Sequence, residues 1–184
     1  MTTRIELGFL NGYAPSWAER IVEGSALVLG HPVAAVDLEM ELPRYYSADR
    51  GQYNATLILA GLLRYHSDPE SKIVGITRVD LFIPVLTFVF GQAQLNGPGA
   101  LVSTHRLRNE YYGLPRDRER LVERTIKEVV HEVGHSFGLV HCQDYNCVMH
   151  ASTYVEDVDL KSSSFCPSCE SQLQEDTVQP RAIV

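Results

Sequence analysis

Eleven residues constrain this chain more than any other stretch. They read HEVGHSFGLVH and run from His131 to His141. His131 and His135 are four residues apart, so on a helix they lie one turn apart on the same face and can present two nitrogens to one metal ion. Gly138 permits the backbone turn that ends the helix, and the chain can then return His141 as a third ligand. The spacing predicts a helix that ends in a three-histidine zinc site.

A carboxylate beside such a site predicts chemistry rather than a purely structural role. Three protein ligands leave one coordination position of zinc open, and Glu132, next to the first histidine, is placed to act as a general base in peptide hydrolysis. The alternative is a helix whose histidines face solvent or satisfy hydrogen bonds in the core. The glycine and the third histidine after the HExxH pair favour the metal site.

The four cysteines form two close pairs along the sequence. Four residues separate Cys142 from Cys147, and two separate Cys166 from Cys169. Two close pairs joined by a loop are the spacing of a tetrahedral zinc site in which thiolates fill every position, so we expect a structural zinc here. Two disulfides, a redox pair at Cys166 and Cys169, and four unrelated thiols are the alternatives. A redox pair would follow a strand and begin a helix, whereas a polar loop and a polar tail are expected around this one.

The segment from His131 to Cys169 resembles the extended signature of the archaemetzincins, a branch of the metzincin zinc metallopeptidases. The resemblance rests on HEVGHSFGLVHC, on Cys147-Val-Met149 and on Cys166-Pro-Ser-Cys169. The stretch from Met149 to Cys166 is slightly shorter than the usual pattern, a difference that a surface loop can absorb. The resemblance implies His131, His135 and His141 as catalytic zinc ligands, Glu132 as base, Met149 in a Met-turn beneath the metal, and the four cysteines as a second zinc site.

From the residues alone, Met149 would be assigned to core packing. Because Cys142 directly follows His141, we also expect the structural zinc to hold the third catalytic ligand in place.

The pattern of apolar residues predicts one α/β domain over residues 1–184, with a metzincin-like mixed sheet of about five strands. A long amphipathic helix from residue 115 or 116 should carry the HExxH pair at its end. Residues 142–169 should form a zinc-bound loop region, followed by an exposed, poorly ordered tail from residue 170. The strands are expected at 5–9, 33–38, 73–77, 86–94 and 100–104, and the two earlier helices from residue 15 to the His31-Pro32 break and over 53–65.

By resemblance, a peptide substrate should pair as an extra strand with the edge of this sheet. Residues 88–94 are the candidate edge, with Phe90, Gly91 and Gln92 as substrate-binding residues. The alternative is an ordinary core strand with Phe88 and Phe90 packed inward.

Composition limits the possible partners. The formal charge is −7, and no stripe rich in lysine and arginine is present, which argues against nucleic acid and against anionic membranes. The N-terminus lacks the features of a signal peptide, and no apolar run reaches membrane-spanning length. We therefore expect a soluble cytoplasmic protein, where a reducing environment keeps thiols available for zinc. A monomer that acts on a peptide or protein substrate is favoured.

Two other functions remain open at this point. One is a zinc-stabilised protein that binds peptides or proteins and whose peptidase activity is latent or restricted to a single substrate. The other is a four-cysteine redox or metal-sensing module. Four further histidines have no ligand spacing and are assigned to surface or loop positions: His31, His66, His105 and His150.

Overall fold

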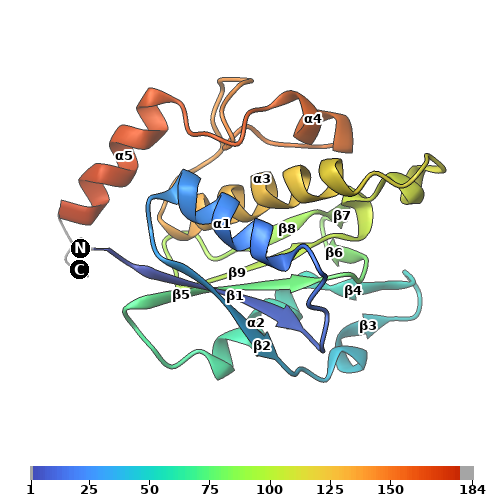
Figure 1. Cartoon of the computed structure of the whole chain (residues 1–184). Helices are drawn as coiled ribbons and strands as arrows, with labels where there is room; N and C mark the ends of the chain where they lie inside the picture. The colour runs from blue at the N-terminus through green and yellow to red at the C-terminus, as the bar shows by residue number, and fades with distance from the viewer. Residues whose placement is uncertain (1, 179–184) are drawn as a thin grey trace.

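The main sheet lies between two helical layers (Figure 1). The computed structural model describes residues 2–178. The sheet has five strands in the order β2-β1-β5-β9-β8, and all are parallel except β8, which runs antiparallel to β9 at one edge. The prediction of a mixed sheet of about five strands is confirmed. The strands are β1 (Arg4–Leu10), β2 (Val33–Leu38), β5 (Ser71–Thr77), β8 (Gly91–Ala93) and β9 (Gly99–Ser103).

Helices cover both faces of this sheet because its central strands are apolar on both sides. Leu7 of β1 packs in one core cluster with Val129 and Val133 of α3. On the opposite face, Ile58 of α2 packs in a second cluster with Leu101 of β9. This packing fixes the position of α3, the helix that carries the HExxH pair. Within residues 2–178 the helices are α1 (Ala18–Leu29), α2 (Ala55–Tyr65), α3 (Arg118–Ser136), α4 (Val155–Leu160), α5 (Pro167–Val178) and the 3-10 helices η1 (Leu42–Tyr45), η2 (His105–Leu107) and η3 (Asn109–Tyr112).

A second sheet of four short strands was not predicted. Its order is β3-β4-β6-β7. The single strand predicted over residues 86–94 is wrong, because β7 pairs with β6 in this second sheet whereas β8 pairs with β9 in the main sheet, with Phe90 between them. A continuous apolar run does not reveal that its two halves pair with different partners. The strands are β3 (Tyr46–Ser47), β4 (Gln52–Asn54), β6 (Leu81–Ile83) and β7 (Leu86–Val89).

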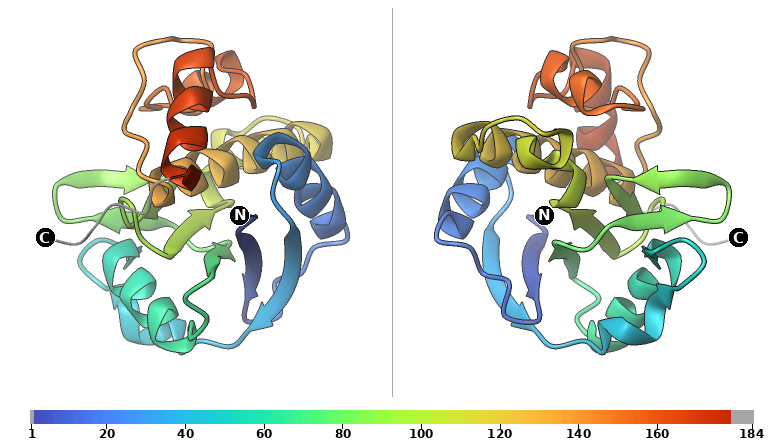
Figure 2. Two further views of the ribbon diagram at one scale, coloured as in Figure 1. Left: turned by 90° about the vertical axis from the view of Figure 1, so that its left-hand side faces the viewer. Right: turned by 90° about the vertical axis from the view of Figure 1, so that its right-hand side faces the viewer.

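The C-terminal region stacks over α3 on the side away from the sheets (Figure 2). It contains α4 and α5, so the tail predicted from residue 170 is helical up to residue 178, and residues 179–184 lie outside the described residues. Leu173 of α5 packs against a cluster that includes Cys147 and Val130. This tertiary contact stabilises α5, a helix that its mainly polar sequence did not predict. No helix within residues 2–178 combines the length and the apolar composition needed to cross a bilayer.

Candidate active site and four-cysteine cluster

The three motif histidines meet at the end of α3. Asp117 caps the start of the helix, and its side chain accepts a hydrogen bond from the Arg120 backbone N–H at 3.0 Å. It ends at Ser136, and Gly138 then adopts a φ of +96°, which glycine tolerates at no steric cost. The turn returns His141 to the two histidines of the helix, and one candidate ligand atom from each imidazole lies within 4.8 Å of the others.

Backbone carbonyls orient the two helical imidazoles. His131 Nδ1 donates to the Val148 carbonyl at 2.8 Å, and His135 Nδ1 donates to the Leu139 carbonyl at 2.7 Å. Because a carbonyl only accepts, each Nδ1 carries the hydrogen, and each Nε2 is left with a free lone pair. The two Nε2 atoms are 3.1 Å apart. Nitrogens bound to one tetrahedral zinc are about 3.3 Å apart, so the site fits zinc.

Burial lowers the pKa of all three imidazoles, and most strongly that of His131. The Lys161 ammonium lowers the pKa of His131 further. Neutral imidazole is the form that binds a metal, so these environments favour ligation near neutral pH.

Glu132 lies beside the histidines and is 5 % exposed. Burial raises its pKa well above the usual value, the neighbouring Glu128 carboxylate raises it further, and Lys161 opposes the shift. The opposite wall of the site comes very close to this side chain at Gly91. A Cβ at position 91 would lie 2.5 Å from Glu132 Oε1 and 2.7 Å from Glu132 Cγ. Glycine therefore allows the sheet edge to approach the candidate base.

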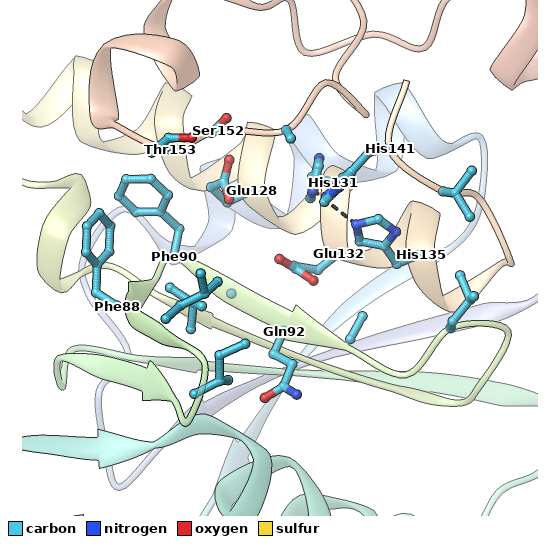
Figure 3. A pocket seen from close by; sticks show the side chains of 18 of the residues that line it. Phe88, Phe90, Gln92, Glu128, His131, Glu132, His135, His141, Ser152 and Thr153 are labelled. Carbon is cyan, nitrogen blue, oxygen red and sulfur yellow. Dashed lines mark hydrogen bonds between the residues drawn. The ribbon is translucent and has the colours of Figure 1, made fainter. Parts of the chain in front are cut away.

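The histidines and Glu132 open onto a cleft of about 530 Å³ (Figure 3). One wall is formed by residues of β7 and β8, and the other by residues 151–153, which follow the third histidine. Phe90, Gly91 and Gln92 all border this cleft, although Phe90 is also part of the core.

The edge strand β8 exposes backbone groups to the cleft at alternate residues. The Phe90 carbonyl accepts from Ser103 N–H at 2.8 Å, and Gln94 N–H donates to the Gly99 carbonyl at 2.9 Å. Even-numbered residues thus pair with β9, and by antiparallel alternation the N–H and C=O groups of Gly91 and Ala93 point outward. The Gln92 side chain turns away and accepts a hydrogen bond from the Thr56 hydroxyl at 3.1 Å. Ala93 borders the cleft as well; it lies within the predicted edge, residues 88–94, but was not among the three residues named as substrate-binding.

The four cysteine sulfurs also converge, within 4.8 Å of one another, and none is in a disulfide. Cys142 Sγ and Cys166 Sγ are 3.8 Å apart. This matches the spacing of about 3.8 Å between thiolates on one tetrahedral zinc ion. Burial raises the pKa of Cys147 and Cys169, so a bound cation would be needed to ionise all four thiols near neutral pH.

One argument made from the sequence against a redox pair is wrong. A helix does begin at the second cysteine pair, because α5 starts at Pro167. What separates this site from a redox pair is its other neighbours: Cys142 and Cys147 complete a cluster of four sulfurs, and no strand of the described residues leads into Cys166.

A short segment, residues 147–150, joins the two clusters. Cys147 supplies a sulfur, and the next residue, Val148, holds His131 through its carbonyl. Met149 is fully buried, and its carbonyl accepts from Cys142 N–H at 2.9 Å. Its thioether lies against Gly134, between the two helical histidines, because a Cβ added there would collide with the sulfur. The segment therefore passes beneath the histidine cluster.

A buried ion pair next to the site was not predicted. Lys161 Nζ lies 3.1 Å from Glu128 Oε1, 3.3 Å from the His150 carbonyl and 3.5 Å from His131 Nδ1. Glu128 precedes Glu132 by one helical turn, so the spacing of α3 could have placed it at the site. A lysine in a polar loop carries no comparable signal.

Comparisons with known proteins agree with this geometry. The sequence model of peptidase family M54 matches residues 21–175. The chain is 44 % identical over 138 residues to the archaemetzincin of Methanocaldococcus jannaschii, covering 74 % of this chain and 75 % of that protein. It is 38 % identical over 170 residues to the archaemetzincin of Pyrococcus furiosus, covering 92 % and 85 %.

Solved structures resemble the fold over nearly its whole length. The crystal structure of archaemetzincin from Methanopyrus kandleri superposes with a TM-score of 0.83 at 37 % identity, covering 97 % of each chain. A zinc-dependent peptidase from Methanocorpusculum labreanum superposes with a TM-score of 0.85 at 31 % identity, covering 92 % of this chain and 99 % of that one. On sequence and on fold, this chain belongs to peptidase family M54, the archaemetzincin zinc metallopeptidases.

Proposed function

We propose that this chain hydrolyses peptide bonds in the cleft, with one zinc ion held by His131, His135 and His141 and with Glu132 as general base. The observation that carries the proposal is the convergence of three neutral imidazoles on an open cleft, with a buried carboxylate beside them. Zinc bound there supplies a Lewis acid that polarises the peptide carbonyl and acidifies water.

Glu132 moves the proton in this proposal. One carboxylate oxygen takes a proton from the attacking water and later delivers it to the departing amine. Its low-dielectric surroundings raise its pKa, which favours holding the proton between these two events. Gly91 leaves the room in which the carboxylate can face the scissile bond.

The substrate backbone pairs with the open side of β8. Gly91 and Ala93 offer the outward N–H and C=O groups, so an extended peptide adds a further strand to the sheet. Phe90 forms an apolar wall of the same cleft. Gln92 keeps the strand in position through Thr56 rather than by touching the peptide.

The four cysteines hold a second zinc ion in this proposal, for two ions per chain. Four thiolates leave no position open, so this zinc stabilises the fold instead of reacting. Met149 forms the apolar floor under the catalytic metal. Thiolate ligands fit a reducing compartment such as the cytoplasm.

The decisive experiment is digestion of a diverse peptide library, with products identified by mass spectrometry. Zinc content is measured on the same sample. Glu132→Ala should retain zinc and cleave at least about 10³-fold more slowly. Glu123→Gln is the matched control, because Glu123 lies on the exposed face of the same helix, with its side chain 65 % exposed. Absence of cleavage by protein that holds both zinc ions would favour a peptide-binding protein instead. Normal turnover by Glu132→Ala would remove Glu132 from the mechanism.

A further inference from the structure

One end of the cleft contains a polar pocket that the proposed mechanism does not use. Glu128 lies at the back of this pocket, one helical turn before Glu132 (Figure 3). Ser152 and Thr153 lie opposite, and the Phe90 ring is at its side. The pocket is thus adjacent to the reacting groups.

Two buried oxygens in this pocket accept no hydrogen bond from the described residues. They are Glu128 Oε1 and Ser152 Oγ. Glu128 is 3 % exposed, and its Oε1 has a charge partner, because Lys161 Nζ lies 3.1 Å away. Ser152 Oγ has no such partner among the described residues. Buried polar oxygens without hydrogen bonds are rare in folded proteins, because each has lost its bonds to water. A ligand that carries hydrogen-bond donors would supply a bond to Ser152 and a second charge-assisted bond to the Glu128 carboxylate.

The pocket presents the carboxylate and not the ammonium of this ion pair. Glu128 borders the cleft, whereas Lys161 is not among the residues that line it. The other nearby cation is also neutralised: the Arg106 guanidinium lies 4.2 Å from the centroid of the Phe88 ring and pairs with Asp80 at 2.6 Å. Among the described residues, no lysine or arginine lines the cleft, so a basic ligand meets no unpaired positive side chain of that kind at the pocket wall.

The side of the pocket is aromatic. Phe88 and Phe90 pack edge to face, with ring centroids 5.3 Å apart, and both border the cleft. Such a wall suits the aliphatic stem of a long side chain whose charged end reaches further in. A carboxylate from the substrate would instead lie against the Glu128 carboxylate.

We propose that Glu128 and Ser152 form a specificity pocket for the basic side chain, arginine or lysine, of a substrate residue next to the cleaved bond. The charged groups of both side chains carry only N–H donors, which match the Ser152 oxygen and the Glu128 carboxylate, and hydrogen bonds between a cation and a carboxylate are stronger than neutral ones. The proposal rests on the proposed peptidase function, because it names the substrates of the same cleft.

The test uses a set of four peptides that differ only at one position beside the scissile bond. That position carries arginine, lysine, glutamine or leucine. The zinc-loaded full chain should show a kcat/KM at least about tenfold higher for arginine than for leucine. Glu128→Gln should reduce that ratio to within about threefold, and Ser152→Ala should reduce it partially. Glu123→Gln should leave the ratio unchanged. The ratio is measured within each variant, so it does not depend on how much zinc the variant retains.

A double variant and a binding assay complete the test. Glu128→Gln could unfold because Lys161 is left unpaired. In that case the double variant Glu128→Gln/Lys161→Met, which removes both charges, is used in its place. Binding of the same peptides to Glu132→Ala, followed by fluorescence anisotropy, reports selectivity without cleavage.

Cleavage that favours leucine, or an arginine preference that survives both Glu128→Gln and Ser152→Ala, would overturn the pocket and leave the peptidase function standing. Absence of cleavage, together with arginine-selective binding that depends on Glu128, would overturn the peptidase function and support the pocket.

Discussion

The histidine cluster and the four-cysteine cluster lie on either side of the same segment, residues 147–150, yet they differ in access. His141 is exposed, and its cluster opens onto a cleft of about 530 Å³. In the cysteine cluster, Cys147 and Cys169 are buried, and sulfurs can fill all four positions of a tetrahedral ion. Three ligands with an opening suit reaction, and four ligands without one suit folding. With zinc at both clusters, as proposed, ligand number and access rather than metal type would separate the two roles.

Removing one ligand from each cluster tests that comparison most directly. Cys147→Ser should lower the free energy of unfolding by about 5 kcal/mol, because the proposed second zinc, which would tie α5 to the rest of the C-terminal region, is lost. His135→Ala should cost less than about 2 kcal/mol, since α3 is already packed on the sheet, although cleavage should disappear. Urea unfolding in zinc-containing buffer gives both values. A larger loss of unfolding free energy in His135→Ala than in Cys147→Ser would contradict the distinction between the two clusters.

The ion pair beside the histidine cluster should have the next largest effect. Lys161→Met leaves the buried Glu128 carboxylate unpaired and should destabilise the fold by about 3 kcal/mol. Glu128→Gln/Lys161→Met should recover most of that loss, because no buried charge remains without a partner. Thermal and urea unfolding of the single and double variants measure the coupling. Additive effects would show that the two side chains do not act as a pair.

The close approach of the sheet edge to Glu132 should matter for activity more than for stability. Gly91→Ala should lower kcat/KM by about 100-fold, equivalent to about 2.7 kcal/mol, because the new methyl group displaces the carboxylate. Unfolding free energy should change by less than about 1 kcal/mol. Thr56→Ser is the control, since it keeps the hydroxyl that donates to Gln92 on the far side of β8 and adds no bulk near Glu132. Full activity in Gly91→Ala would mean that the carboxylate has room to shift.

The smallest effect should be the coupling between the two clusters. Cys142→Ser should empty the cysteine site and also weaken zinc binding at the histidine site by about tenfold. Cys142 follows His141 directly, so loss of the metal at its sulfur frees the backbone that places the third histidine. Competition with a chromophoric chelator measures both affinities. Asp144→Asn, in the same loop, is the control. An unchanged affinity at the histidine site would show that the clusters are independent.

The local parts of this molecule could be predicted from sequence, and the long-range parts could not. The spacing of His131 and His135 needs only helical geometry, and two close cysteine pairs need only a loop to converge. In contrast, β7 and β8 look like one strand because their partners, β6 and β9, are chosen by tertiary pairing. The helix α5 has few apolar residues, and the contact of Leu173 with the cysteine cluster is not local in sequence.

The distinction between local and long-range features also explains which site residues the sequence analysis did not identify. Glu128 shares a helix face with Glu132, so the motif could have identified it. Lys161 reaches the site only because α4 and the loop after it fold back over α3. The two members of that ion pair lie 33 positions apart in the sequence, which is beyond any local pattern.

The open edge of the sheet has a consequence for how copies of this protein behave in concentrated solution. A strand with unpaired backbone groups is a template for any extended chain, including another copy of the same protein, and long edges of this kind promote aggregation. Here β8 spans only Gly91–Ala93, and only two of its residues direct hydrogen-bonding groups outward. Such a short edge can align a peptide for cleavage, while offering too few bonds to seed sheet-to-sheet self-association.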